Sequence, residues 1–210
     1  MQRNPTSSGL SNSEYRAPHT ERDGARNPHG NPTGNLGGKT PAINAPDFAQ
    51  LPSCGDFDMR IARDGTWFYR GSPIGRKPLV KLFSTVLRRE NGEFWLVTPV
   101  ERGRILVDDA PFVAVEVDAA GEGRSRRLTF RTNVDDSVTA DEHHPIRVDH
   151  DPATGQPTPY VTVRDGLEAR ILRPVYYHLV ELGEFAEVDG AEQLGVWSGG
   201  RFFPLGRVAA

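Results

Sequence analysis

The feature that most constrains the fold is a short order of elements that occurs twice. The triplet Arg-Asp-Gly at positions 63–65 returns at positions 164–166, an offset of 101 residues from position 63 to position 164. Each triplet lies between two extended runs, MRIARDGTWFYR and PYVTVRDGLEARI, and an Asp-Gly pair between such runs is typical of a β-hairpin. Two copies are too few and too far apart for a solenoid. We therefore expect an α+β fold of two related halves, each a curved antiparallel sheet covered by one helix.

A helix is expected after each hairpin. In the first half, apolar residues recur at the helical period from about Pro78, which predicts a core-facing stripe of Leu79, Leu82, Phe83, Val86 and Leu87. Pro78 suits the start of this helix, and Asn91-Gly92 is a natural end for it. In the second half the run RPVYYHLVEL begins with Arg173 and Pro174 and predicts the equivalent helix.

The other ordered segments read as strands. GEFWLVTPVERGRILV predicts a hairpin that turns around positions 101–103, and GVWSGGRFFPLG predicts one that turns at positions 198–200. PFVAVEV, RLTFRTN and HPIRV predict further strands, and a Gly/Pro loop follows HPIRV.

The first 46 residues differ in composition from the rest of the chain. They hold six glycines and six prolines with no apolar periodicity, which predicts a disordered tail. We expect three parts: this tail at 1–46, an N-terminal half at 47–122 and a C-terminal half at 123–210. Five of the 25 basic and three of the 28 acidic residues lie in the tail, which leaves the folded part with a formal charge of −5.

Composition excludes several classes of protein. The 210 residues contain no apolar run long enough to span a bilayer, and the N-terminus lacks the pattern of a signal peptide. The single cysteine, Cys54, cannot form an intramolecular disulfide, which fits a reducing compartment, so we expect a cytoplasmic protein. The net charge of −3 argues against a general nucleic-acid or membrane binder, so any site for an anion must be local.

Positive charge gathers where both helices begin. Arg70, Arg76 and Lys77 precede or open the first helix, and Arg170 and Arg173 precede or open the second. A cation at a helix N-terminus is disfavoured by the helix dipole unless an anion joins it. Arginine binds carboxylate or phosphate in a bidentate manner, so these residues either hold an external anion or pair internally with Glu101, Asp108 or Asp109.

Other candidate residues carry weaker patterns. The DEHH run at 141–144 with Asp149 and His150 lacks the spacing of a metal site, and Cys54 lacks an activating context. Asp108 and Asp109 point apart if they are extended, which favours pairing with arginine over a shared-proton dyad. Thr98 and Glu101 either close a hairpin or face a cleft, and Ser198 and Arg201 either form a tight turn or meet a partner.

At the level of whole segments the chain resembles a bacterial conserved domain family of unknown function. The segments GSPI, LVTPVE, DDAPF and GVWSGG carry the resemblance, which covers positions 57–206. It implies a duplicated α+β core whose C-terminal half is superficially similar to pleckstrin-homology-like folds. It also implies a binding or signalling role, with a ligand, protein or nucleic acid between the halves, and it brings no catalytic residues.

We therefore expect a binding or signalling module that holds a protein, a peptide or a small anionic ligand near the interface of its halves. The sequence shows no nucleophile with its base, no phosphate-binding glycine loop and no spaced metal ligands, so we expect neither catalysis nor a metal or cofactor. The rival hypothesis is an enzyme acting on an anionic small molecule, with Glu101 or Asp109 as general base. Nucleic acid is a less favoured partner. The candidate ligand-binding residues are Arg70, Ser72, Arg76, Lys77, Thr98, Glu101, Asp108, Asp109, Arg170, Arg173, Ser198 and Arg201.

Overall fold

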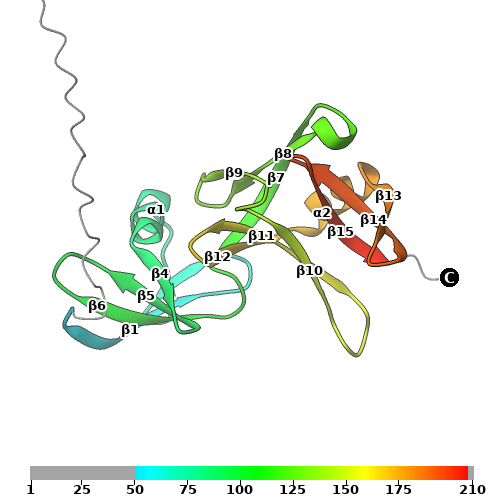
Figure 1. Ribbon diagram of the computed structural model, residues 1–210. Helices are drawn as coiled ribbons and strands as arrows, with labels where there is room; N and C mark the ends of the chain where they lie inside the picture. The colour runs from blue at the N-terminus through cyan, green and yellow to red at the C-terminus, as the bar shows by residue number, and fades with distance from the viewer. Residues whose placement is uncertain (1–50, 208–210) are drawn as a thin grey trace, which may run out of the picture. The chain divides into compact units, whose positions relative to one another are not determined.

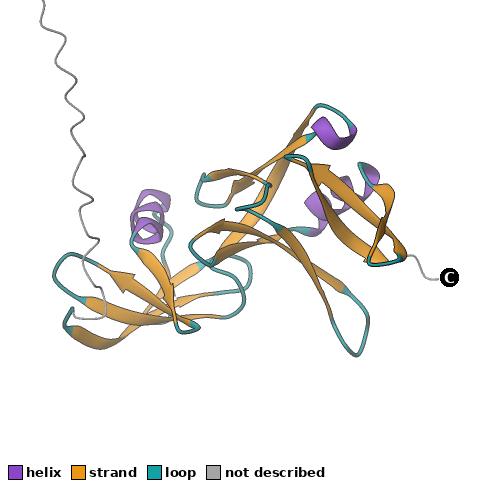
Figure 2. Ribbon diagram, viewed as in Figure 1, coloured by secondary structure: helices purple, strands orange, loops and turns teal. Residues whose placement is uncertain are grey.

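The computed structural model describes residues 51–207, all of which belong to one unit, Asn44–Ala210. The predicted tail therefore lies outside the described residues. Within them the protein is mostly β, with fifteen strands, two α-helices and the short 3-10 helix η2 (Gly123–Ser125) (Figure 2). Neither of these α-helices is long and apolar enough to cross a membrane.

The first half forms one six-stranded sheet with the order β3-β2-β1-β6-β5-β4 (Figure 1). Its strands are β1 (Ser53–Ile61), β2 (Trp67–Tyr69), β3 (Ser72–Pro73), β4 (Leu87–Glu90), β5 (Glu93–Val97) and β6 (Arg102–Val107). The β1–β2 and β5–β6 hairpins lie where the sequence predicts them. The sequence predicted a purely antiparallel sheet. This prediction was wrong, because β1 and β6 pair in parallel.

The second half contains a six-stranded sheet and a three-stranded one. The larger has the order β10-β11-β12-β7-β8-β9, and the smaller, here called sheet C, has the order β13-β14-β15. The strands are β7 (Phe112–Ala120), β8 (Arg127–Thr132), β9 (Ser137–Thr139), β10 (Ile146–His150), β11 (Pro157–Arg164), β12 (Leu167–Ile171), β13 (Glu184–Val188), β14 (Ala191–Ser198) and β15 (Arg201–Arg207). Here too one pair is parallel, β12 with β7.

Strand β7 belongs to the second half. The sequence analysis placed it in the N-terminal half, which was expected to end at residue 122, but β7 is a central strand of the second sheet, between β12 and β8. Hairpin patterns show which neighbouring strands pair, whereas the parallel pairing of β7 with β12 joins segments that are far apart in sequence. The sheets therefore divide between Val107, the end of β6, and Phe112.

Helix α1 (Lys77–Thr85) is shorter than predicted. Leu87, expected in the helix, opens β4 and is fully buried, whereas Leu82 is 60% exposed. Asn91 and Gly92 do not end the helix; with φ values of 51° and 84° they form the two-residue turn between β4 and β5. Asn-Gly strongly favours such a turn between extended strands. The end of the predicted apolar stripe therefore belongs to a hairpin and not to the helix.

The repeat is present in the order of elements. Hairpin β11–β12 turns at Asp165-Gly166 and leads into α2 (Arg173–Glu181), which buries Val175 and Leu179 and, like α1, has proline in its first turn. Each helix is followed by a three-stranded meander. The meander after α1 joins the sheet of its own hairpin, whereas the one after α2 forms sheet C.

Most of the buried apolar residues form a single cluster to which both halves contribute. Ile61, Trp67 and Leu87 come from the first half, and Phe112 and Phe130 come from the second. All five are at most 1% exposed. The halves therefore share one core rather than each enclosing its own.

Candidate functional site

The sequence candidates lie in three places: at the junction of the halves, in two hairpin turns and at the helix starts. At the junction, Asp109 follows the end of β6. Its Oδ1 accepts a hydrogen bond from the Tyr160 hydroxyl at 2.7 Å, and its Oδ2 lies 3.3 Å from Arg63 and 3.4 Å from Arg170. Its side chain is 16% exposed. One carboxylate thus joins the first RDG turn to strands β11 and β12 of the second half.

The neighbouring Asp108 points elsewhere, as an extended pair should. It binds Arg60 on β1, and this contact lowers the pKa of its carboxyl group despite a smaller opposing effect of desolvation. The two aspartates therefore bind different arginines. The internal pairing considered for Arg170 is confirmed, with Asp109 as its partner.

Contacts at the junction raise the pKa of Tyr160 to about 12, first because the phenol is buried and second because it donates to Asp109. Between pH 10 and 12 the unfolded chain has released this proton and the folded chain has not, so folding stability falls as the pH rises through this window. We expect the Tyr160→Phe variant to show a shallower loss of stability there, measured by urea unfolding at several alkaline pH values. Equal slopes for the variant and the wild type would contradict this assignment.

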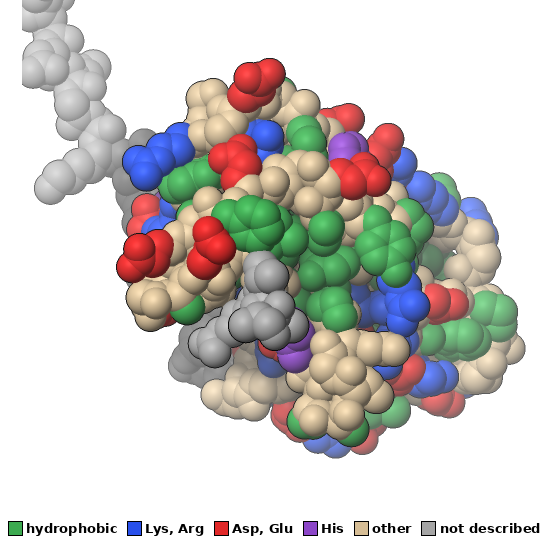
Figure 3. Space-filling view, turned by 90° about the vertical axis from the view of Figure 1, so that its right-hand side faces the viewer, with side chains coloured by type: hydrophobic (Ala, Val, Ile, Leu, Met, Phe, Trp, Pro, Cys, Tyr) green, Lys and Arg blue, Asp and Glu red, His purple; other side chains and the backbone are tan. Residues whose placement is uncertain are grey.

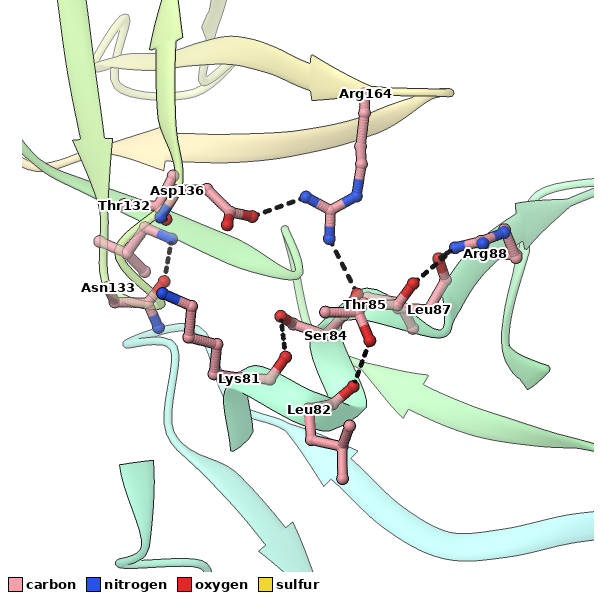
Figure 4. A network of polar contacts seen from close by, with 11 residues as sticks. Lys81, Leu82, Ser84, Thr85, Leu87, Arg88, Thr132, Asn133, Asp136 and Arg164 are labelled. Atoms are coloured by element: carbon pink, nitrogen blue, oxygen red, sulfur yellow. Dashed lines mark hydrogen bonds and ion pairs between the residues drawn. The ribbon is translucent and has the colours of Figure 1, made fainter. Parts of the chain in front are cut away.

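The second RDG turn anchors to the first half. Arg164 donates to Asp136 at 2.6 Å and to the backbone carbonyl of Ser84, at the end of α1, at 2.8 Å (Figure 4). In addition, Arg89 of β4 donates to the carbonyl of Gly166 at 3.3 Å. The first RDG turn is bonded to the second half. The Asn133 side-chain amide donates to the carbonyl of Gly65 at 3.1 Å and accepts a hydrogen bond from the Val113 N–H at 3.0 Å. Each RDG turn is thus bonded to the other half.

The Thr98 and Glu101 candidates close the β5–β6 hairpin. The Thr98 hydroxyl donates to the carbonyl of Glu101 at 2.9 Å and accepts from its N–H at 3.2 Å. The Glu101 carboxylate accepts from the Cys54 thiol at 2.9 Å, which raises the pKa of that thiol and makes it less reactive. Within residues 51–207 no contact joins Glu101 to Arg76, the arrangement that would favour an enzyme.

The Ser198 and Arg201 candidates form a structural turn. Ser198 is fully buried, and its hydroxyl accepts from the Leu128 N–H at 2.9 Å and donates to the carbonyl of Ala140 at 2.6 Å. It therefore fastens sheet C to the larger sheet and is not available to a partner. Arg201, on the surface, lies 3.3 Å from Glu142.

The basic residues at the helix starts separate into paired and unpaired ones. Lys77 binds Asp135 at 2.7 Å, a carboxylate that the sequence analysis did not consider, and Arg173 donates to the Gln156 amide at 3.3 Å. In the described part of the chain, Arg70 and Arg76 have no carboxylate partner. The guanidinium of Arg70 lies 5.2 Å from the ring centroid of Tyr69. Ser72 is exposed on β3.

Arg70 lies on the rim of an apolar groove in the first half. This hollow of about 600 Å³ runs between β1, β2 and α1, with Phe57, Ile74, Leu79 and Phe83 among its lining residues. A second hollow of about 470 Å³ is also lined by residues 56–59 and extends from β1 to β6. We call the first hollow the β1 groove. The Phe57 ring packs against β6 at Gly103. Only glycine leaves room for the ring there, because an added Cβ at position 103 would lie 2.5 Å from the phenyl carbons.

Helix α1 presents two different faces. Leu79 and Phe83, four residues apart, line the β1 groove. The Lys77 side chain at the start of the helix and the backbone carbonyl of Ser84 near its end contact Asp135 and Arg164 of the second half. The helix therefore stands between the groove and the junction.

Sequence reasoning missed several residues of these sites. Asn133, Asp136 and Tyr160 occur in strands or turns with no pattern that indicates a polar role. Phe83 and Leu79 were assigned to the core, because periodicity alone does not distinguish a core-facing stripe from one that lines a groove. The only available signal was the RDG repeat itself, whose two arginines, Arg63 and Arg164, both make junction contacts.

Comparison with known proteins places the chain in a family. Residues 49–110 match the model described as domain of unknown function (DUF1285), N-terminal domain, and residues 111–205 match the model described as protein of unknown function (DUF1285), C-terminal domain. The crystal structure of a DUF1285 family protein from Silicibacter pomeroyi DSS-3 is 57% identical, with a TM-score of 0.71 over 78% of this chain and 88% of that one.

A second DUF1285 family protein, from Shewanella baltica OS155, is 26% identical, with a TM-score of 0.48 over 60% of this chain and 91% of that one. No curated protein matches the chain. The two family models meet between Ala110 and Pro111, within the segment that joins β6 to β7. The chain belongs to the DUF1285 family.

Proposed function

We propose that this protein is a ligand-responsive binding module whose ligand occupies the β1 groove. The observation that carries the proposal is the double role of α1: one face lines an apolar hollow, and the Lys77 side chain and the Ser84 carbonyl are bonded to the second half. A ligand that displaced α1 would alter the contacts of Lys77 and Ser84 with Asp135 and Arg164. This supports the binding and signalling role expected from the sequence, with the ligand beside the junction rather than in it.

The groove suits a ligand with an apolar body and an anionic end. Its lining is mainly aromatic and aliphatic, which favours burial of an apolar group. Arg70 supplies guanidinium donors that fit a carboxylate, sulfonate or phosphate. Two aspartates also line the groove: Asp56 is bonded to Arg104, and Asp58 is exposed, with its backbone carbonyl accepting from the Arg70 N–H at 2.8 Å. Arg70 is the basic residue of this lining, so the anionic end of the ligand would lie there.

The junction itself is less suited to an external ligand, because its carboxylates and arginines bond to each other. Asp109 faces two arginines and a phenol, which leaves little room for action as a general base. The enzyme hypothesis is therefore not favoured. The resemblance of the C-terminal half to pleckstrin-homology-like folds and a cytoplasmic location stay predictions.

The proposal can be tested with 8-anilinonaphthalene sulfonate, which combines an apolar ring system with an anionic group. We expect saturable binding, measured by its fluorescence, that the Leu79→Glu variant abolishes. Arg70→Gln should weaken binding about tenfold, because a hydrogen bond to a charged group contributes about 1.5 kcal/mol or more. The matched control is Leu82→Glu, which places the same charge on the exposed side of α1. Equal fluorescence from the Leu79 and Leu82 variants would refute the proposal, and melting temperatures establish that each variant is folded.

A further inference from the structure

We propose that a cationic amphipathic helix of a partner protein docks on sheet C of the second half. This inference concerns a different surface from the β1 groove and does not depend on the ligand proposed there. Three observations carry it: an apolar hollow on one face of sheet C, exposed apolar side chains beside it, and negative charge at its end.

The hollow exists because α2 is too short to cover sheet C. This helix spans nine residues and packs Val175 and Leu179 into the core. Beyond it lies a hollow of about 510 Å³, whose lining includes Tyr176, Phe185, Leu194 and Leu205. We call it the sheet C groove. Phe185 and Leu194 face each other across β13 and β14, and the Tyr176 hydroxyl holds one wall by donating to the carbonyl of Leu205 at 3.0 Å.

The apolar surface extends past the hollow. Phe185 is 59% exposed and Tyr177, on α2, is 58% exposed, two of the largest exposed apolar side chains in the described residues. Two smaller hollows adjoin the groove, one sharing Tyr176 and the other sharing Leu205. Figure 3 shows hydrophobic side chains gathered on this side of the molecule. Contiguous exposed apolar surface of this kind marks interaction sites.

Negative charge lies at one end of the groove. Glu187 and Glu192 face each other across β13 and β14, two residues along each strand from Phe185 and Leu194, so all four side chains are on one face. Among the side chains that the structure describes, those of residues 51–206, no cation pairs with either glutamate, and like charges in facing positions repel. The sequence adds Glu181, Glu184 and Asp189 and has no lysine or arginine between positions 174 and 200. Of these three, Glu184 lies near Arg126 at 3.5 Å.

The apolar hollow and the negative charge at its end together indicate the kind of partner that would bind there. An apolar floor with an anionic end complements a helix that presents apolar anchors on one face and lysine or arginine beside them. Bound cations would relieve the repulsion between Glu187 and Glu192, which the free protein retains. Anionic lipid surfaces and nucleic acids carry the wrong charge for this face.

The experiment uses a labelled 14-residue peptide of leucine and lysine, arranged as an amphipathic helix, and follows binding to the full chain by fluorescence anisotropy at physiological salt. We expect saturable binding that Phe185→Ser weakens about tenfold, because aromatic anchors dominate such interfaces. Glu187→Gln with Glu192→Gln should weaken binding about fivefold, raise the melting temperature and reduce the salt dependence of binding.

The matched control replaces two exposed acids elsewhere, Asp118→Asn with Glu122→Gln, and should leave affinity within about twofold. A peptide of the same composition in scrambled order, which forms no apolar face, should bind at least about fivefold more weakly. Equal binding of the scrambled peptide, or equal losses in the control and the Glu187/Glu192 variant, would overturn the proposal in favour of non-specific attraction. Self-association of the free chain that Phe185→Ser abolishes, measured by sedimentation, would overturn it in favour of a second copy.

Discussion

Replacing Asp109 by asparagine is expected to destabilise the protein by about 3 kcal/mol, because removal of one partner from a buried ion pair leaves the other charge uncompensated. The Arg170 side chain is 22% exposed and its Nε is buried, whereas Arg63, which also faces this carboxylate, is 63% exposed and stays hydrated. The substitution therefore leaves mainly the Arg170 charge uncompensated. Asparagine retains an oxygen for the Tyr160 hydroxyl, but its amide nitrogen replaces Oδ2 and presents a donor to the two guanidinium groups. Urea unfolding measures the effect.

The adjacent Asp108 provides the control. Its ion pair with Arg60 is more exposed, 31% and 50% for the two side chains, so Asp108→Asn should cost no more than about 1 kcal/mol. If both variants lost the same stability, the junction pair would be no more important than a surface contact, and the assignment of Asp109 as its central residue would fail.

The second large effect is expected at Gly65. This residue has φ +84°, and an added Cβ would lie 2.6 Å from the Asn133 amide nitrogen and 2.9 Å from a Val113 methyl group. Gly65→Ala therefore combines backbone strain of about 1–3 kcal/mol with displacement of the amide that bonds to Gly65 and Val113. We expect a total loss of about 3 kcal/mol in the free energy of unfolding, since each lost hydrogen bond adds about 1 kcal/mol.

The repeat supplies the matched control for this variant. Gly166 also has positive φ, +74°, but an added Cβ would meet only the Arg89 side chain, at 3.9 Å. Gly166→Ala should therefore show the backbone strain alone, about 1–2 kcal/mol. Equal effects of the two alanine variants would show that the Asn133 contact contributes nothing to the junction.

Local patterns predicted the elements of this fold well. The Asp-Gly turns, the proline-started helices and the alternating strands all lie near their expected positions, because these signals act over a few residues. Strands β3, β9 and β13 were not predicted, and the residues of β4 were assigned to the first helix. The length of α1 was overestimated, since the tendency of Asn91-Gly92 to form a hairpin outweighed the apolar period that continued to Leu87.

The candidate site was predicted less well, for a different physical reason. Whether Arg170 pairs internally or holds a ligand depends on which carboxylate the fold brings near, and Asp109 is 61 positions away in the sequence. The partner of Lys77 is 58 positions away, in a turn with no pattern of its own. Long-range contacts of this kind follow from the pairing of β7 with β12, which local periodicity does not encode.

The reciprocal contacts of the two RDG turns bear on the independence of the halves. The family is described by two models that meet at position 110, which suggests two separable domains. Yet the RDG turn of each half is hydrogen-bonded to the other half, and Trp67 and Phe130 belong to one apolar cluster. Cutting the chain at this boundary would expose that cluster and leave Asp109 or Arg170 without its partner. The two halves thus repeat an order of elements without being independent of each other, and we expect the smallest unit that can fold to be the pair.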